Sequence, residues 1–246
     1  MRNILILGAT SGMAQSLAKA LAGPDTRLLL AGRDRGELDR MAADLALRRG
    51  GPEPVVLDFD ARRTERHGDF AARVMKQVEI LDELYLFFGT LHDQRAAEAD
   101  FDLAKNMLEV NFTGAVSVLE RFAGPMARQG RGLIVGVSSV AGDRGRQSNY
   151  LYGSAKAGLT LYLAGLRNRL APAGVHVMTA KPGFVATRMT RGMKQGLLFS
   201  DPDKVVRGMI RAARAGKNVA YLPGFWRWIM WVIRMIPEGV FKRMRL

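Results

Sequence analysis

Short apolar runs alternate along the chain with longer segments in which apolar residues recur every three or four positions. The short runs predict seven β-strands, at residues 4–7, 27–31, 54–59, 83–88, 132–137, 176–181 and 218–222. The longer segments predict helices at residues 13–22, 35–49, 65–78, 103–128, 152–171 and 202–215. Because a helix separates most neighbouring strands and most strands are continuously apolar, the pattern predicts a parallel, doubly wound α/β sheet covered on both faces.

The composition excludes several kinds of chemistry. The 246 residues are 48% hydrophobic and 24% charged, which is typical of a globular protein. The chain contains no cysteine, so disulfides, thiolate catalysis and cysteine-based metal sites are excluded. The three histidines, His67, His92 and His176, lack the spacing of metal ligands, and we expect no metal site.

Positive charge is concentrated in the last quarter of the chain. The net charge is +14, and residues 181–246 contain fourteen Lys or Arg against three acids. Two interpretations are open: a solvated basic surface, or a region that meets an anionic partner such as a phosphate, a phospholipid surface or nucleic acid. Because no recognised nucleic-acid-binding module is present, we expect no nucleic-acid partner.

A glycine-rich turn, Gly8-Ala9-Thr10-Ser11-Gly12-Met13-Ala14, follows the first predicted strand. Glycines let the chain turn tightly and bring backbone N–H groups against a pyrophosphate at a helix N-terminus. A simple strand–helix turn is the alternative, but the position after an N-terminal strand favours a Rossmann-type dinucleotide site. The candidate cofactor residues in this turn are Gly8, Thr10, Ser11, Gly12 and Met13.

The tips of the second and third strands carry charged side chains. Arg33 lies at the tip of the second strand, and Asp34 follows it. In dinucleotide folds an acid here binds the ribose 2′-hydroxyl, whereas an arginine pairs with a 2′-phosphate. We therefore favour NADP(H), with NAD(H) and an ordinary surface arginine as alternatives. Asp58 and Phe59 end the third strand and are candidates for contact with the adenine, although Asp58 could instead cap a helix or turn.

The strongest chemical signal lies between residues 138 and 156. Ser138 and Ser139 follow a predicted buried strand, and Tyr152 and Lys156 lie four residues apart near the start of a helix. That spacing puts both side chains on one helical face, so the ammonium can lie beneath the phenol. A nearby cation is expected to lower the tyrosine pKa from about 10 toward the range of a proton-transfer catalyst. Ser139 is then placed to hold a substrate oxygen.

Together these motifs resemble the short-chain dehydrogenase/reductase family over nearly the whole chain. The resemblance implies that Tyr152 is the general acid, that Lys156 contacts the nicotinamide ribose and tunes Tyr152, and that Ser139 orients the carbonyl. It also implies that Asn111, in Val110-Asn111-Phe112-Thr113-Gly114, holds a water in the proton relay.

Two further segments carry expectations from this resemblance. The segment Pro182-Gly183-Phe184-Val185-Ala186-Thr187 matches the family's loop beside the nicotinamide. Its implied cofactor contacts are Pro182, Gly183, Val185 and Thr187, and the implied substrate contacts are Phe184 and Arg188. The segment Phe87-Phe88-Gly89-Thr90 departs from the family's Asn-Asn-Ala-Gly, although Gly89 still permits a close backbone approach to the cofactor.

Several segments are similar to a narrower group, the decaprenylphosphoryl-2-keto-ribose reductases. They are Leu57-Asp58-Phe59-Asp60-Ala61, Phe88-Gly89-Thr90-Leu91-His92-Asp93, residues 111–118, Arg188-Met189 and residues 225–237. Enzymes of that group reduce a lipid-linked 2-keto-pentose after a flavin oxidase has formed the keto group, which completes an epimerisation that makes an arabinose donor for the cell wall. Arg33 departs from that group's cofactor-binding tip.

Residues 225–236 combine three tryptophans with Ile, Met and Val, and are interrupted by Arg227 and Arg234. The stretch is too short to span a bilayer, which needs about 20 residues. It predicts an amphipathic helix lying among lipid headgroups. A lid over the substrate pocket or a dimer contact is the alternative. For a lipid-linked substrate, the candidate partners of its phosphate are Arg188, Arg191 and Lys194.

We expect one domain, in which residues 1–224 bind the dinucleotide and catalyse the reaction and residues 225–246 form an apolar, basic tail. The predicted activity is NAD(P)H-dependent reduction of a polyprenyl-phosphate-linked 2-keto-pentose. The alternatives are a reductase of another lipophilic carbonyl (steroid, retinoid or acyl) and a non-catalytic NAD(P)-binding interaction protein. We also expect a flavin-dependent oxidase as partner, a homo-oligomer, and a cytoplasmic location with peripheral contact to the inner face of the cytoplasmic membrane.

Overall fold

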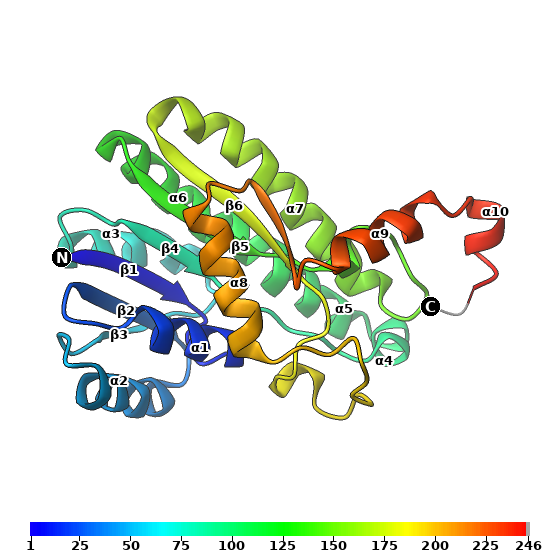
Figure 1. Cartoon of the computed structure of the whole chain (residues 1–246), viewed down its shortest axis with the longest axis horizontal. Helices are drawn as coiled ribbons and strands as arrows, with labels where there is room; N and C mark the ends of the chain where they lie inside the picture. The colour runs from blue at the N-terminus through cyan, green and yellow to red at the C-terminus, as the bar shows by residue number, and fades with distance from the viewer. Residues whose placement is uncertain (245–246) are drawn as a thin grey trace.

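The computed structural model of the protein describes residues 1–244, without the side chain of residue 49, around a seven-stranded sheet (Figure 1). The strands are β1 (Arg2–Leu7), β2 (Thr26–Gly32), β3 (Val55–Asp58), β4 (Glu83–Leu86), β5 (Gly132–Val137), β6 (Val175–Pro182) and β7 (Val219–Leu222). Their order is β3-β2-β1-β4-β5-β6-β7, and all neighbouring pairs are parallel. The predicted fold class is confirmed.

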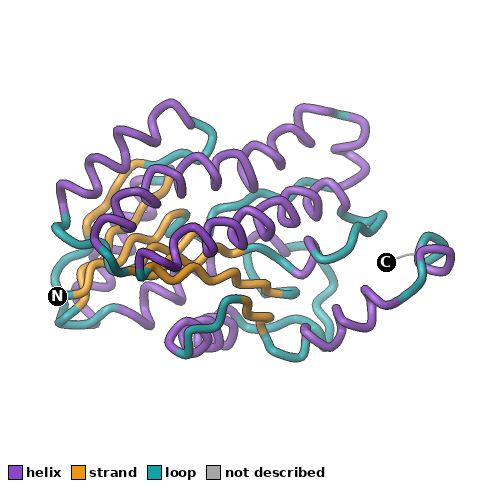
Figure 2. Tube along the Cα trace, turned by 90° about the horizontal axis from the view of Figure 1, so that it is seen from above, coloured by secondary structure: helices purple, strands orange, loops and turns teal. Residues whose placement is uncertain are grey.

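Helices cover both faces of this sheet (Figures 1 and 2). One face carries α1 (Gly12–Leu21), α2 (Arg35–Arg49) and α8 (Pro202–Arg214), and the other carries α3 (His67–Gln77), α6 (Gly114–Gln129) and α7 (Tyr150–Leu170). Side chains alternate along β1, so Ile4 and Ile6 join the first core and Leu5 and Leu7 join the second. This double burial explains why the strands are continuously apolar.

The strand order fixes where a ligand can bind. Because β1 lies between β2 and β4, the chain leaves the sheet in opposite directions on either side of it. A crevice forms at the carboxyl ends of the strands at such a switch point. The glycine-rich turn follows β1 there, and Phe88 and Gly89 follow β4 on its other side.

The predicted helix at residues 103–128 is two helices joined by a π-helical turn. The structure has α5 (Phe101–Leu108), the turn Glu109–Thr113 and α6. A π turn changes the apolar periodicity too little to be seen in the sequence, although such turns are frequent at functional sites. It carries Asn111, whose side chain is buried. The short α4 (Gln94–Ala99) was not predicted because six residues show no clear period.

The C-terminal region contains α9 (Trp226–Met235), where an amphipathic helix was predicted, and α10 (Glu238–Phe241). Trp226 and Met230 form the buried face of α9 and pack with Val140. Arg144 fixes the end of α9 because its guanidinium donates to the carbonyls of Ile233 and Ile236, each at 2.6 Å. None of the helices within residues 1–244 is both long and apolar enough to span a bilayer.

Candidate active site

Two adjoining cavities lie at the carboxyl edge of the sheet. The first is lined by the glycine-rich turn and by the ends of β2 and β3, and the second by Ser139, Tyr152, Lys156 and the segment after β6. They share Phe87, Phe88, Gly89 and Met189. The edge of the sheet therefore offers one compartment for a nucleotide and a second for the reacting groups. Among residues 1–244, no three His, Asp or Glu side chains are grouped as metal ligands.

The glycine-rich turn depends on Gly8. Gly8 has a φ of +76°, and a Cβ there would lie 2.5 Å from the Phe88 backbone nitrogen. Ser11 caps α1 by accepting a hydrogen bond from the Ala14 N–H at 3.3 Å. The turn lines the first cavity at the N-terminus of α1, which is where backbone N–H groups favour a phosphate. Met13 lies in the second cavity.

Two arginines line the first cavity beyond the turn. Arg33 was predicted, whereas Arg62, which follows β3, was missed although the ends of parallel strands meet at one edge. Asp34 caps α2 by accepting from the Glu37 N–H at 2.9 Å. Phe59 lines the cavity, whereas Asp58 is exposed and is not among the lining residues, and its adenine contact stays a prediction.

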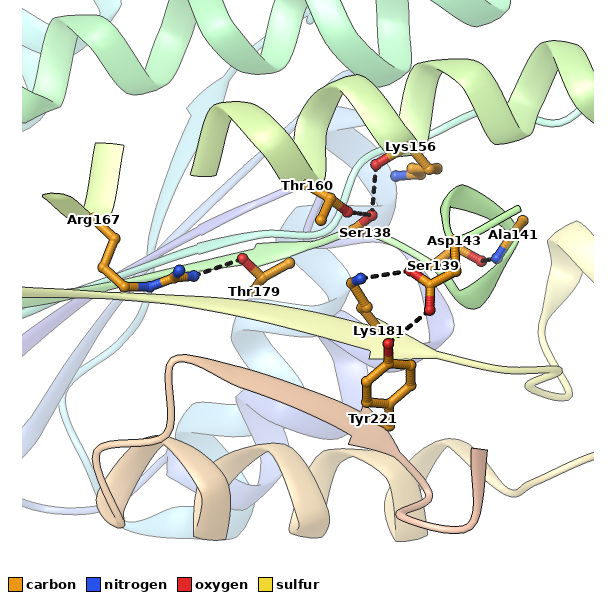
Figure 3. Close-up of polar contacts among 10 residues, drawn as sticks. All are labelled: Ser138, Ser139, Ala141, Asp143, Lys156, Thr160, Arg167, Thr179, Lys181 and Tyr221. Carbon is orange, nitrogen blue, oxygen red and sulfur yellow. Dashed lines mark hydrogen bonds and ion pairs between the residues drawn. The ribbon is translucent and has the colours of Figure 1, made fainter. Parts of the chain in front are cut away.

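The structure brings Ser139, Tyr152 and Lys156 together, as the spacing predicted. The Lys156 Nζ lies 5.7 Å from the centre of the Tyr152 ring and donates to the Val137 carbonyl at 3.0 Å. Ser138 anchors the same helix, since its hydroxyl donates to the Lys156 carbonyl at 2.8 Å and bonds with the Thr160 hydroxyl at 2.7 Å (Figure 3). Ser138 is thus a positioning residue, and Ser139 faces the cavity.

Burial dominates the proton affinities of this pair. It raises the pKa of Tyr152 to about 12, and a weaker interaction with the Ser139 hydroxyl acts in the opposite direction. Burial also lowers the pKa of Lys156 to about 8. The net shift of the Tyr152 pKa is therefore upward, opposite to the expected lowering, because desolvation penalises the charged phenolate. Tyr152 is a protonated phenol at neutral pH.

Asn111 is held against the segment that follows β4. Its Nδ2 donates to the carbonyls of Thr90 at 2.7 Å and Met107 at 2.8 Å, and its Oδ1 accepts from the Thr90 N–H at 3.2 Å. Both amide hydrogens are thus engaged by the protein, and any bond to water would be accepted by Oδ1. A Cβ on Gly89 would lie 2.7 Å from that Oδ1, which explains why glycine stands there.

The segment after β6 borders both cavities. Pro182, Gly183, Phe184, Val185 and Thr187 line the second cavity, as the predicted contacts require. Arg188, predicted to bind substrate, instead lines the first cavity.

The guanidinium of Arg188 pairs with Glu37 at 3.1 Å and donates to the Thr10 carbonyl. A carboxylate and a carbonyl outside the second cavity therefore hold this side chain at the cofactor end of the crevice. Arg191 and Lys194 are exposed and line neither cavity.

Comparisons with known proteins agree with this geometry. The family described as short chain dehydrogenase matches residues 2–197. An uncharacterized oxidoreductase of Mycobacterium tuberculosis is 38% identical over 242 residues, which cover 98% of this chain and 96% of the relative. An uncharacterized oxidoreductase of Streptomyces coelicolor is 33% identical over 245 residues, covering 99% and 96%. The chain belongs to the short-chain dehydrogenase family, so the expectation of a nicotinamide-dependent oxidoreductase is confirmed at the level of the family.

Solved structures show the same fold. The short-chain dehydrogenase of Sphingobium yanoikuyae in complex with NADPH aligns with a TM-score of 0.80 at 21% identity, covering 100% of this chain and 97% of that one. The alcohol dehydrogenase of Thermococcus sibiricus complexed with 5-hydroxy-NADP aligns with a TM-score of 0.81 at 22% identity, covering 97% and 99%.

Proposed function

We propose that the protein is an NADPH-dependent reductase that converts a keto group to an alcohol, and that its substrate is a 2-keto-pentose carried by a polyprenyl phosphate. The observation that carries the reductase assignment is the convergence of Ser139, Tyr152 and Lys156 in one cavity next to the glycine-rich turn. A bound nicotinamide would supply the hydride, and the protein supplies the proton and the alignment.

Ser139, Tyr152 and Lys156 have different roles in the reduction. The Ser139 hydroxyl donates to the carbonyl oxygen and so orients it beside Tyr152. The Tyr152 phenol gives its proton to that oxygen as negative charge develops there. The Lys156 ammonium, fixed by the Val137 carbonyl, stabilises the phenolate that remains. Because burial raises the pKa of Tyr152 to about 12, the proton needed for reduction is present at neutral pH.

Two observations support NADPH over NADH. Arg33 and Arg62 line the first cavity near the end of β2, where a 2′-phosphate would lie, and guanidinium groups bind phosphate by paired hydrogen bonds. Similar structures from Sphingobium yanoikuyae and Thermococcus sibiricus contain NADPH and a modified NADP.

The substrate assignment rests on the sequence similarity to the keto-ribose reductases and on the apolar wall of the second cavity. That wall includes Leu91, Phe184, Met189 and Met193. A flavin-dependent oxidase that forms the keto group belongs to the same proposal. The alternatives are a reductase of a steroid, retinoid or acyl carbonyl, and a non-catalytic NAD(P)-binding interaction protein.

The outer face of α9 and α10 supports peripheral contact with an anionic bilayer. Trp228 is 66% exposed and Trp231 is 59% exposed, and Val232, Met235 and Val240 are exposed beside them. The exposed basic residues of this region are Arg227, Arg234, Lys242 and Arg243. Exposed tryptophan flanked by cations fits the boundary between headgroups and acyl chains. Self-association through α5–α6 and α7, where Leu161 is exposed, completes the proposal.

The activity is tested with purified protein, NADPH and a lipid-linked 2-keto-pentose, with a soluble keto-sugar and a steroid ketone as comparisons. Tyr152→Phe should lower the rate of NADPH oxidation by roughly 10²- to 10⁴-fold, because the general acid is lost, while NADPH binding persists. Equal rates for Tyr152→Phe and the unaltered protein would contradict the role of Tyr152. A preference for the steroid ketone would contradict the substrate.

The pKa of Lys156 predicts a pH dependence. The ammonium is present below pH 8 and is lost as the pH rises through about 8, whereas Tyr152 keeps its proton until about 12. The kcat/KM of carbonyl reduction should therefore fall by about tenfold between pH 7 and pH 9. In Lys156→Arg this fall should disappear, since the guanidinium stays charged. A flat profile to pH 10 for the unaltered protein would exclude a role for the ammonium.

The cofactor preference predicts the effect of removing both cations. Arg33→Gln combined with Arg62→Gln should lower kcat/KM for NADPH roughly ten- to hundredfold, because a charge-assisted contact with the 2′-phosphate is lost. The value for NADH should change much less, and Arg73→Gln on the exposed side of α3 serves as control. Parallel losses with both cofactors would refute recognition of the 2′-phosphate by these arginines.

Membrane contact predicts a difference in vesicle flotation. Trp228→Ser combined with Trp231→Ser should reduce binding to phosphatidylglycerol vesicles, since the exposed rings are removed while the buried Trp226 is kept. Leu47→Ser, at an exposed apolar residue on α2, is the matched control. Undiminished flotation of the double variant, or binding that ignores the vesicle charge, would disprove the contact.

A further inference from the structure

The loop between Ser139 and α7 carries two polar side chains that the mechanism does not use. Arg146 and Asn149 line the second cavity together with Ser139, Tyr152 and Phe184. The Arg146 Nε and the Asn149 Oδ1 are buried, and neither has a hydrogen-bond partner within the described part of the chain. Buried polar groups normally have hydrogen-bond partners in the folded protein. Two polar atoms without partners in one cavity therefore point to a ligand.

Arg146 is a cation without a counter-ion. No carboxylate of residues 1–244 lies within ion-pair distance of its guanidinium. The nearby Asp143 is already engaged, since it pairs with Lys181 at 2.5 Å and accepts from the Tyr221 hydroxyl at 2.7 Å (Figure 3). Burial lowers the pKa of Arg146, and the negative charge of Asp143 acts in the opposite direction without forming a direct ion pair.

Asn149 stands at the N-cap position of α7, where an asparagine side chain usually accepts a hydrogen bond from the first turn. Here it makes no such bond. An amide acceptor that faces a cavity without a partner suits a hydroxyl or amine donor of a ligand. Arg146 and Asn149 therefore complement two different groups on one molecule.

The loop is fixed on both sides of Arg146. Arg144 is tied to the end of α9 and pairs with Glu238 at 2.9 Å, and the Gln147 amide donates to the Met244 carbonyl at 3.0 Å. Asp143 joins the loop to β6 and β7. The residues that hold the loop, Asp143, Arg144 and Gln147, do not line the cavity, whereas Arg146 and Asn149 do. Such preorganisation is what a substrate contact requires.

We propose that Arg146 and Asn149 form a subsite for an anionic group, a phosphate or a carboxylate, and an adjacent hydroxyl of the carbonyl substrate. This inference rests on the proposed reductase function and narrows its substrate to hydroxylated, anionic carbonyl compounds. Arginine suits this role because its planar guanidinium can bind two oxygens of a phosphate or carboxylate at once. Arg188, Arg191 and Lys194 lie outside this cavity and do not compete for the anion.

The test compares matched charged and neutral substrates. A 2-keto-pentose phosphate is paired with the free 2-keto-pentose, and 3-oxobutanoate with its methyl ester, so that the two pairs separate phosphate from carboxylate. The unaltered protein should prefer the charged member of at least one pair. Arg146→Gln should lower the charged-to-neutral ratio of kcat/KM roughly ten- to hundredfold, Arg146→Lys should lower it less, and Arg73→Gln should not change it.

Asn149→Asp supplies a second variant, because a carboxylate beside Arg146 would neutralise the cation and lower the same ratio. Thermal unfolding checks that each variant folds. An unchanged ratio in Arg146→Gln, or equal losses for charged and neutral substrates, would overturn the subsite.

A measurement without turnover separates this inference from the proposed function. In NMR spectra, the Arg146 Nε–H resonance is identified as the one that is absent in Arg146→Gln. In the unaltered, NADP⁺-saturated protein this resonance should shift when inorganic phosphate or acetate is added. Such a shift without any carbonyl-dependent NADPH oxidation would reject the reductase and keep the anion site. Carbonyl-dependent NADPH oxidation with no shift of the Nε–H resonance and no preference for charged substrates would reject the anion site and keep the reductase function.

Discussion

The side chains of Ser138 and Lys156 hold the carboxyl end of β5 against the first turns of α7. Ser138 donates to the Lys156 carbonyl, and the Lys156 ammonium donates back to the Val137 carbonyl. Both contacts are buried, and a buried polar group left unpaired costs about 1–3 kcal/mol. Because Ser139 is the next residue on the strand side and Tyr152 lies one turn before Lys156, this junction sets the distance between the groups that act on the substrate.

The burial that fixes this junction also sets its chemistry. Burial raises the pKa of Tyr152 to about 12, so Tyr152 stays a phenol. Burial also lowers the pKa of Lys156 to about 8, so the ammonium is deprotonated more easily. A buried acid that retains its proton suits reduction, since that direction consumes a proton. The same burial destabilises the ammonium of Lys156, which at neutral pH is stabilised by its hydrogen bond to the Val137 carbonyl.

The sequence predicted the parts of the site that depend on local spacing. Tyr152 and Lys156 share a helical face, and the glycine-rich turn follows a strand, so both positions follow from the helix and strand periods. The position of Arg188 could not be predicted, because its partners Glu37 and Thr10 are more than 150 residues away. Arg146 and Asn149 were missed for a related reason: their unpartnered state appears only once Asp143 and Arg144 are seen to be engaged elsewhere.

The basic C-terminal region shows why net charge along a sequence says little about a ligand. Lys181 is neutralised by Asp143 and Arg188 by Glu37, whereas the cations of α9 and those that follow α10 remain on the surface. Arg146 lies outside that region and adds a single charge, yet it is unpaired and lines the catalytic cavity. The same loop carries Arg144, which binds the end of α9. The proposed membrane contact of α9 would therefore involve a helix that is tied directly to the loop lining the substrate cavity.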